Sequence, residues 1–175
     1  MHKGGYKARI AVAKSAFMKY KGLIRRGINM RLKMKILNTY IFSVVTYAAE
    51  TWTFTQEVVN KVNSFELWCY RRILKISYID HVSNEEVMRR MGTRLTFLNR
   101  IKSRKIRYAG HIMRGSGGNR SALILEGKFE GKRAQGRPRR MWTNDITEWT
   151  RFKDYAEMKR TACDREKWRS IASTF

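Results

Sequence analysis

The sequence contains few acidic residues. Only 14 Asp and Glu stand against 38 Lys and Arg in 175 residues, which gives a formal net charge of +24. Residues 1–49 hold eleven basic residues and no acidic residue, and residues 91–140 hold fourteen basic and two acidic residues. Residues 50–90 and 141–175 are nearly neutral. This excess of positive charge is larger than solubility requires, and it predicts a polyanionic partner.

Proline and cysteine are also rare, with one proline and two cysteines. One proline, five tryptophans and 43% hydrophobic residues predict a folded, helix-rich chain and exclude wholesale disorder. Cys69 and Cys163 each fall on an apolar helical stripe. We therefore expect two buried free thiols in a reducing compartment, without a disulfide.

Long apolar runs are absent. The longest uncharged run, residues 36–49, is too short to span a bilayer, so no membrane partner is expected. No secretory signal is visible. The acid-free first 35 residues are similar to a mitochondrial transit peptide, which leaves mitochondrial import as an alternative to a nuclear location.

Residue patterns that carry catalysis are missing as well. The acidic residues fall at predicted helix caps or in helix-surface pairs, and no glycine-rich stretch has phosphate-loop spacing. The best soft-metal ligands lie far apart, whereas zinc ligands come in close pairs; they are Cys69, His81, His111 and Cys163. We expect no catalytic residue, no metal site and no cofactor in this chain.

Apolar residues recur mainly with helical spacing, which predicts a mostly α-helical fold. Residues 1–115 are expected to form a bundle of about five helices, with Asn29 and Ser83 as N-caps. The run GSGGN at 115–119 predicts a break, followed by a short strand candidate at 122–129 and a basic loop at 131–140. Residues 116–140 thus form a hinge segment. Residues 141–175 are predicted to form one short helix and a last helix over 154–172.

The stretch 96–114, TFLNRIKSRKIRYAGHIMR, carries two helical stripes. One stripe is predicted to face a core, and it consists of Leu98, Ile101, Lys105, Tyr108 and Ile112. The other points roughly 160° away, and it consists of Arg100, Arg104, Arg107, His111 and Arg114. A solvated helix face usually mixes charges, but this helix has no acidic residue. The pattern favours nucleic-acid binding by its four arginines.

The loop GKRAQGRPRR forms a second basic element just past the glycine-rich break. It contains Gly136-Arg137-Pro138, the core of an AT-hook-like arm that can enter a narrow minor groove; a basic linker or nuclear-import signal fits equally well. Its candidate binding residues are Lys132, Arg133, Arg137, Arg139 and Arg140. A secondary set in the first basic block consists of Lys14, Lys21, Arg25 and Arg26.

Three aromatic residues are candidates for base stacking, although core packing is favoured for each. They are Trp52, Tyr108 and Trp142.

Several blocks in fixed order resemble one family. Their most specific parts are AETW at 49–52, Trp68-Cys69-Xaa-Arg71-Arg72-Ile73-Leu74, Gly110-His111 and Gly136-Arg137-Pro138-Xaa-Xaa-Xaa-Trp142. The matching blocks are ARIAVAKSAF at 8–17, YAAETWTFT at 47–55, FELWCYRRILKISYIDHVSNEEV at 65–87, LNRIKSRKIRYAGHIMR at 98–114, GKRAQGRPRRMWTNDI at 131–146 and ACDREKWRSIA at 162–172. In this order and spacing they are similar to the C-terminal part of non-LTR (LINE-type) retrotransposon reverse transcriptases, over nearly the whole chain.

The resemblance implies polymerase thumb helices and a C-terminal linker that hold RNA, DNA or their hybrid. It also implies a palm domain as a partner of residues 8–49, with Mg²⁺ bound in that palm. This sequence has no Tyr-Xaa-Asp-Asp motif, and none of its four aspartates is adjacent to another. Because polymerase chemistry needs metal ions held by carboxylates, we expect a truncated, non-catalytic part of such an enzyme.

Two other readings stay open at this stage. One is a standalone or domesticated nuclear DNA-binding protein that uses the Gly-Arg-Pro arm. The other is a mitochondrial or ribosome-associated basic protein. An element-derived chain is expected in the nucleus and, as a ribonucleoprotein, also in the cytoplasm. The patterns specify no oligomeric state.

Overall fold

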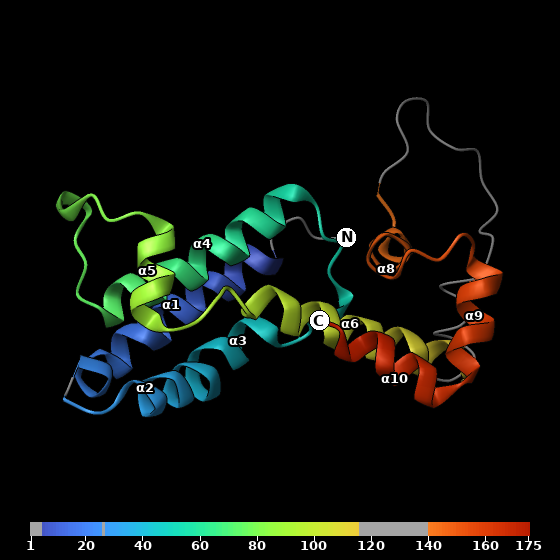
Figure 1. Ribbon diagram of the computed structural model, residues 1–175, viewed down its shortest axis with the longest axis horizontal. Helices are drawn as coiled ribbons and strands as arrows, with labels where there is room; N and C mark the ends of the chain where they lie inside the picture. The colour runs from blue at the N-terminus through green and yellow to red at the C-terminus, as the bar shows by residue number, and fades with distance from the viewer. Residues whose placement is uncertain (1–4, 26, 116–139) are drawn as a thin grey trace. The chain divides into compact units, whose positions relative to one another are not determined.

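The computed structural model describes residues 5–25, 27–115 and 140–175 (Figure 1). The described residues form helices joined by short connections and contain no strand, which confirms the mostly α-helical prediction. The strand candidate at 122–129 and most of the basic loop lie outside the described residues. In the described ranges, no helix is long and apolar enough to cross a membrane.

Contacts divide the chain into two compact units. Unit 1 comprises residues 1–49 and 56–101, and unit 2 comprises residues 50–55 and 102–175. The division therefore falls inside helix α6, Phe97–Met113, and not at the predicted position 115. The cause is packing, because the larger part of α6 shares its core with the C-terminal helices.

Unit 1 is built on two long helices, α1, Gly5–Arg25, and α4, Gln56–Ile73, which pack together. Between them in the sequence come α2, Met30–Ile36, a π-helical turn, Leu37–Phe42, and α3, Ser43–Thr46. The Asn29 side chain accepts a hydrogen bond from the Leu32 amide at 2.8 Å, so the predicted N-cap is confirmed. Helix α3 ends directly after the β-branched residues Val44 to Thr46.

The connection from α4 to α5, Asn84–Met91, contains a single 3₁₀ turn, η3, Tyr78–Asp80. Ser83 caps α5 by accepting from the Glu86 amide at 3.2 Å. The Glu86 carboxylate pairs with Arg89 and Arg90, each at 2.7 Å.

The core of unit 1 contains a cluster of phenylalanine rings and one buried carboxylate. Phe42 stacks on Phe97 at 4.3 Å between ring centroids. Glu66 accepts hydrogen bonds from the Tyr70 hydroxyl at 2.6 Å and from the Thr96 amide at 3.1 Å and the Phe97 amide at 3.2 Å. It therefore satisfies donors at the start of α6. The expectation that all acidic residues lie at caps or on surfaces is wrong for Glu66.

Unit 2 contains α8, Trp142–Thr150, α9, Tyr155–Cys163, and α10, Arg165–Ser173, together with the larger part of α6. The predicted single helix over 154–172 is wrong, because it breaks at Asp164. The Asp164 carboxylate accepts from the Glu166 and Lys167 amides, both at 3.1 Å, and so caps α10.

The cysteine prediction holds for one residue. Cys69 is fully buried in α4, whereas Cys163 is exposed. Cys163 is the last residue of α9, where the chain turns into α10, so the apolar stripe that predicted its burial is interrupted.

Candidate nucleic-acid interface

Helix α6 presents the two stripes that its sequence predicts. Ile101, Lys105 and Ile112 are buried, and the side chains of the opposite stripe are exposed up to His111, with Arg114 partly exposed. Tyr108, which was assigned to the buried stripe, is 37% exposed. The buried face also includes Ile106, Ala109 and Met113, because α6 packs against several helices of unit 2.

Lys105 is fully buried and forms an ion pair with the fully buried Asp145 of α8. Its amine also donates to the Trp52 carbonyl at 2.7 Å and lies 4.9 Å from the centre of the Trp142 ring. Burial lowers the pKa of Lys105 to about 8, and the Asp145 carboxylate opposes this shift. Asp145, too, contradicts the expectation that acidic residues lie at surfaces.

This pair anchors the segment 50–55 within unit 2. Asp145 accepts from the Phe54 amide at 2.8 Å, and the Trp142 indole donates to the Glu50 carbonyl at 2.7 Å. The AETW block and Trp142 therefore hold the segment 50–55 in place within unit 2. Of the three aromatic stacking candidates, Trp142 is held in the unit 2 core, Trp52 is partly buried, and Tyr108 is the most open.

Several predicted phosphate-binding arginines already have partners. Arg104 pairs with Glu50 at 2.7 Å, and Arg140 pairs with Asp145 at 2.7 Å and with Glu148. Arg100 donates to the neutral Asn38 side chain at 2.5 Å. The charge of Arg104 or Arg140 is thus partly neutralised inside the protein, while other arginines are available to an external anion.

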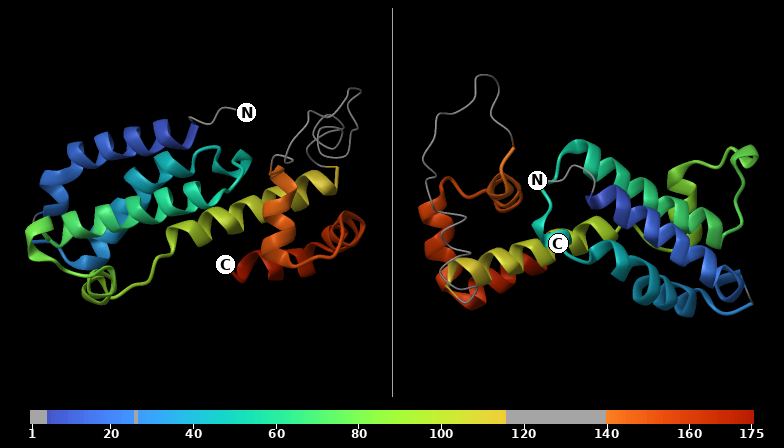
Figure 2. Two further views of the ribbon diagram at one scale, coloured as in Figure 1. Left: turned by 90° about the horizontal axis from the view of Figure 1, so that it is seen from above. Right: turned by 180° about the vertical axis from the view of Figure 1, so that it is seen from behind.

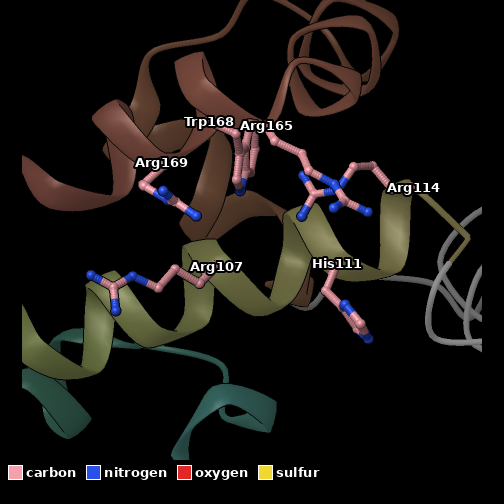
Figure 3. A pocket seen from close by; sticks show the side chains of 6 residues that line it. All are labelled: Arg107, His111, Arg114, Arg165, Trp168 and Arg169. Atoms are coloured by element: carbon pink, nitrogen blue, oxygen red, sulfur yellow. The ribbon is translucent and has the colours of Figure 1, made fainter.

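Four other arginines, all in unit 2, line a cleft between α6 and α10. It encloses about 630 Å³, and its described lining consists of Arg107, His111, Arg114, Arg165, Trp168 and Arg169 (Figure 3). Arg114 and Arg165 reach one end of the cleft from different helices, and Arg107 and Arg169 lie further along it. The described lining contains no acidic side chain.

The cleft exists because α10 packs directly along α6, as both views of Figure 2 show. The Trp168 indole lies over Gly110 and donates to the Ile106 carbonyl at 2.7 Å. The Ser103 hydroxyl donates to the Ala172 carbonyl at 2.6 Å one turn further along. These contacts fix the two helices in register, so that arginines of α10 face arginines of α6.

The cleft concentrates positive charge without internal compensation. Arg114 donates to the Ala162 carbonyl at 2.7 Å, and its buried Nε atom has no partner within the described residues. Arg107, Arg165 and Arg169 form no ion pair with another described residue. Neighbouring guanidinium groups repel each other, so an anion between them is favoured by Coulomb attraction to all of them. Chemically, the cleft suits phosphate or another multivalent oxyanion.

The sequence predicted half of this cleft. Arg107, Arg114 and the adjacent His111 belong to the predicted row on α6, but Arg165 and Arg169 were not predicted. They lie in the stretch 141–175, whose net charge is nearly neutral, so a count of charge over this stretch does not indicate a basic site. The available signal was their position three residues before and one residue after Trp168, a large apolar residue expected to be buried.

The remaining predicted residues are only partly placed. Lys14 is exposed on α1 with its amine 5.3 Å from the Trp68 ring centre, and Lys21 is partly exposed. Outside the described residues lie Arg26, the side chain of Arg25, and Lys132, Arg133, Arg137 and Arg139. A joint surface of helix and loop therefore stays a prediction.

Comparison with known proteins finds a similarity to a transposon-derived protein. The chain is 24% identical over 150 residues to an uncharacterized transposon-derived protein of Caenorhabditis elegans, across 81% of this chain. The chain spans about half of that relative, 54% of its length. No protein family model matches the chain, and no solved structure matches it.

Proposed function

We propose that this chain binds RNA, DNA or their hybrid through phosphate contacts, as the non-catalytic C-terminal part of a LINE-type retrotransposon reverse transcriptase. The observation that carries the binding proposal is the cleft lined by Arg107, Arg114, Arg165 and Arg169. The similarity to a transposon-derived protein and the ordered motif blocks support the element of origin. Nuclear action and a polymerase palm as the partner of residues 8–49 follow from the same proposal.

Arginine suits this role because its planar fork donates two parallel hydrogen bonds to phosphate oxygens. The cleft arginines come from helices held by buried contacts, so their backbone positions are fixed before a ligand arrives. Exposed Tyr108 belongs to the same unit and directly follows Arg107 on α6. Contacts to phosphate position a nucleic acid without reading its sequence.

The test is a salt titration of binding by fluorescence anisotropy, with single-stranded RNA, duplex DNA and a hybrid of equal length. Binding through six to ten phosphates lowers the affinity by about 10³–10⁵-fold between 50 and 200 mM salt. The double variant R107Q/R169Q should reduce the slope of log affinity against log salt by about 1.8 on duplex DNA. A slope near zero for the wild type would overturn the proposal.

A matched control separates the cleft from overall charge. R89Q/R90Q removes the same two charges from α5, where both arginines are already paired with Glu86. It should change the slope much less than R107Q/R169Q. An equal change in both variants would show that net charge, and not the cleft, governs binding.

The non-catalytic part of the proposal is tested by primer extension with this chain, Mg²⁺ and deoxynucleotides. No extension is expected, and robust extension would contradict it. The genomic sequence upstream of the coding region tests the element of origin: an intact or decayed frame encoding Tyr-Xaa-Asp-Asp is the expected finding.

A further inference from the structure

The connection between α4 and α5 in unit 1 presents two large apolar side chains to solvent. Tyr78 is 92% exposed and Ile79 is 80% exposed, more than any other large apolar side chain among the described residues. They are neighbours on the turn η3, which stands away from the helices of unit 1 in Figure 1. Single exposed apolar residues are common, but an adjacent pair at a protruding turn indicates a contact surface.

The turn that carries them is held by its own hydrogen bonds. The Ser77 amide donates to the Asp80 carboxylate at 2.6 Å, and the Ser77 side chain accepts from the Asp80 amide. The chain then reverses at His81, which has a positive φ of 45°. Arg71 of α4 donates to the Val82 carbonyl at 2.8 Å and to the Asn84 side chain at 2.9 Å. Tyr78 and Ile79 are therefore presented by a preorganised backbone, which reduces the entropic cost of binding.

The surroundings of the turn are positively charged. Arg71, Arg72 and Lys75 lie at the end of α4 or just after it, and none of the three forms an ion pair with another described residue. Arg71 is bound to neutral oxygens, and Arg72 lies over the Trp68 ring at 4.1 Å. The carboxylate within the turn itself, Asp80, is engaged by the backbone of that turn. This charge complements a polyanion better than it complements an apolar protein groove.

We infer that Tyr78 and Ile79 form a base-contacting tip, in which the tyrosine ring stacks on an unpaired base and the isoleucine packs beside it. Aromatic rings bind bases of any sequence through their faces, and apolar side chains such as isoleucine separate adjacent bases in known complexes. The nearby cations hold the flanking phosphates. This inference rests on the proposed function, since it assumes nucleic-acid binding, but it concerns a different surface in the other unit.

The experiment compares Tyr78→Ala with wild type on two single strands of equal length, one with bases and one with an abasic backbone. Loss of one stacked base should weaken binding to the normal strand by about 5- to 140-fold. The effect should disappear on the abasic strand, and the salt slope should stay at the wild-type value because no charge is removed. Tyr78→Phe should retain the affinity, and Ile79→Ala should show a smaller loss.

Tyr47→Ala is the matched control, since Tyr47 is a 62% exposed tyrosine of the same unit. The Tyr47→Ala variant should bind the normal single strand with the wild-type affinity. All variants should keep the wild-type thermal unfolding midpoint. Equal binding of Tyr78→Ala and wild type, with a steep salt slope, would overturn the tip while leaving the proposed function intact. A flat salt slope in the wild type would overturn both.

Discussion

The Trp168 indole occupies the space in which any residue other than glycine at position 110 would place its β-carbon. A β-carbon built on Gly110 lies 2.2 Å from the Trp168 Nε1 atom and 2.4 Å from its Cδ1 atom. The same Nε1 atom donates to the Ile106 carbonyl. The missing side chain at position 110 thus permits the close approach of α10 to α6, and with it the arginine cleft.

Gly110→Ala should destabilise the protein despite the higher helix propensity of alanine. The added methyl group displaces the indole and weakens its hydrogen bond, and overpacking of this kind costs about 1–3 kcal/mol. The free energy of unfolding in urea measures the effect. Gly22→Ala is the control, because nothing lies within 4 Å of its added β-carbon on α1; it should be neutral or slightly stabilising. Equal effects of the two substitutions would contradict the packing argument.

Lys105→Met should lower the free energy of unfolding by about 3–5 kcal/mol, because it removes one partner of a buried ion pair and leaves the Asp145 charge less compensated. Arg104→Met provides the comparison on the same helix. Its partner Glu50 also lies in the segment 50–55, but the Arg104 side chain is 47% exposed, so the loss should be below about 1 kcal/mol. Urea unfolding of both variants tests this, and a smaller cost for Lys105→Met than for Arg104→Met would refute the assigned role of the pair.

The pH dependence of stability should have opposite signs at two glutamates. Burial raises the pKa of the Glu66 carboxyl group. The contribution of Glu66 to folding stability is therefore fully present below the ordinary pKa of 4.5, and it is lost as pH rises through the raised pKa. Relative to wild type, Glu66→Gln should therefore gain stability between pH 4 and pH 7.

Hydrogen bonds from Arg89 and Arg90 lower the pKa of Glu86 to about 2. Its contribution is present above 4.5 and is lost as pH falls towards 2, so Glu86→Gln should lose stability relative to wild type as pH rises from 2 to 4.5. Urea midpoints measured across pH for both variants provide the readout. Two trends of the same sign would be inconsistent with these environments.

The two thiols should react at very different rates. Cys163 is exposed, whereas Cys69 is buried, and burial together with the nearby Glu66 carboxylate raises its pKa. A disulfide reagent at neutral pH should modify one thiol per native chain and two per unfolded chain. Cys163→Ser should abolish the fast reaction, and Cys69→Ser should leave it unchanged. A fast reaction that survives in Cys163→Ser would place Cys69 at the surface.

Local patterns in the sequence predicted most helices, because their apolar spacing and caps are local properties. The stripes of α6, the Asn29 cap and the helix over 142–150 follow from such signals. The break at Asp164 was missed, although aspartate is a strong N-cap, because the apolar pattern on both sides suggested continuity. Local patterns could not reveal that Lys105, placed on an apolar stripe, has the distant Asp145 as its partner.

The candidate site was predictable only on its α6 side. The arginine row on one helix is visible from spacing alone, but Arg165 and Arg169 join it only through the contact of Trp168 with Gly110. In the same way, the pairing of Arg104 with Glu50 and of Arg140 with Asp145 reflects tertiary contacts. Charge counts over sequence blocks overstate how many cations are available, because they include those that the fold itself neutralises.

The chain passes between the two units after residues 49, 55 and 101. Six residues, 50–55, thus belong to unit 2 although both of their neighbours in sequence belong to unit 1. Any rearrangement of the gene with a single breakpoint between codons 56 and 101 would separate Lys105 from the Trp52 carbonyl and Trp142 from the Glu50 carbonyl. The smallest piece that can be inherited with unit 2 intact therefore runs from codon 50 to codon 175, and it carries residues 56–101 of unit 1 with it.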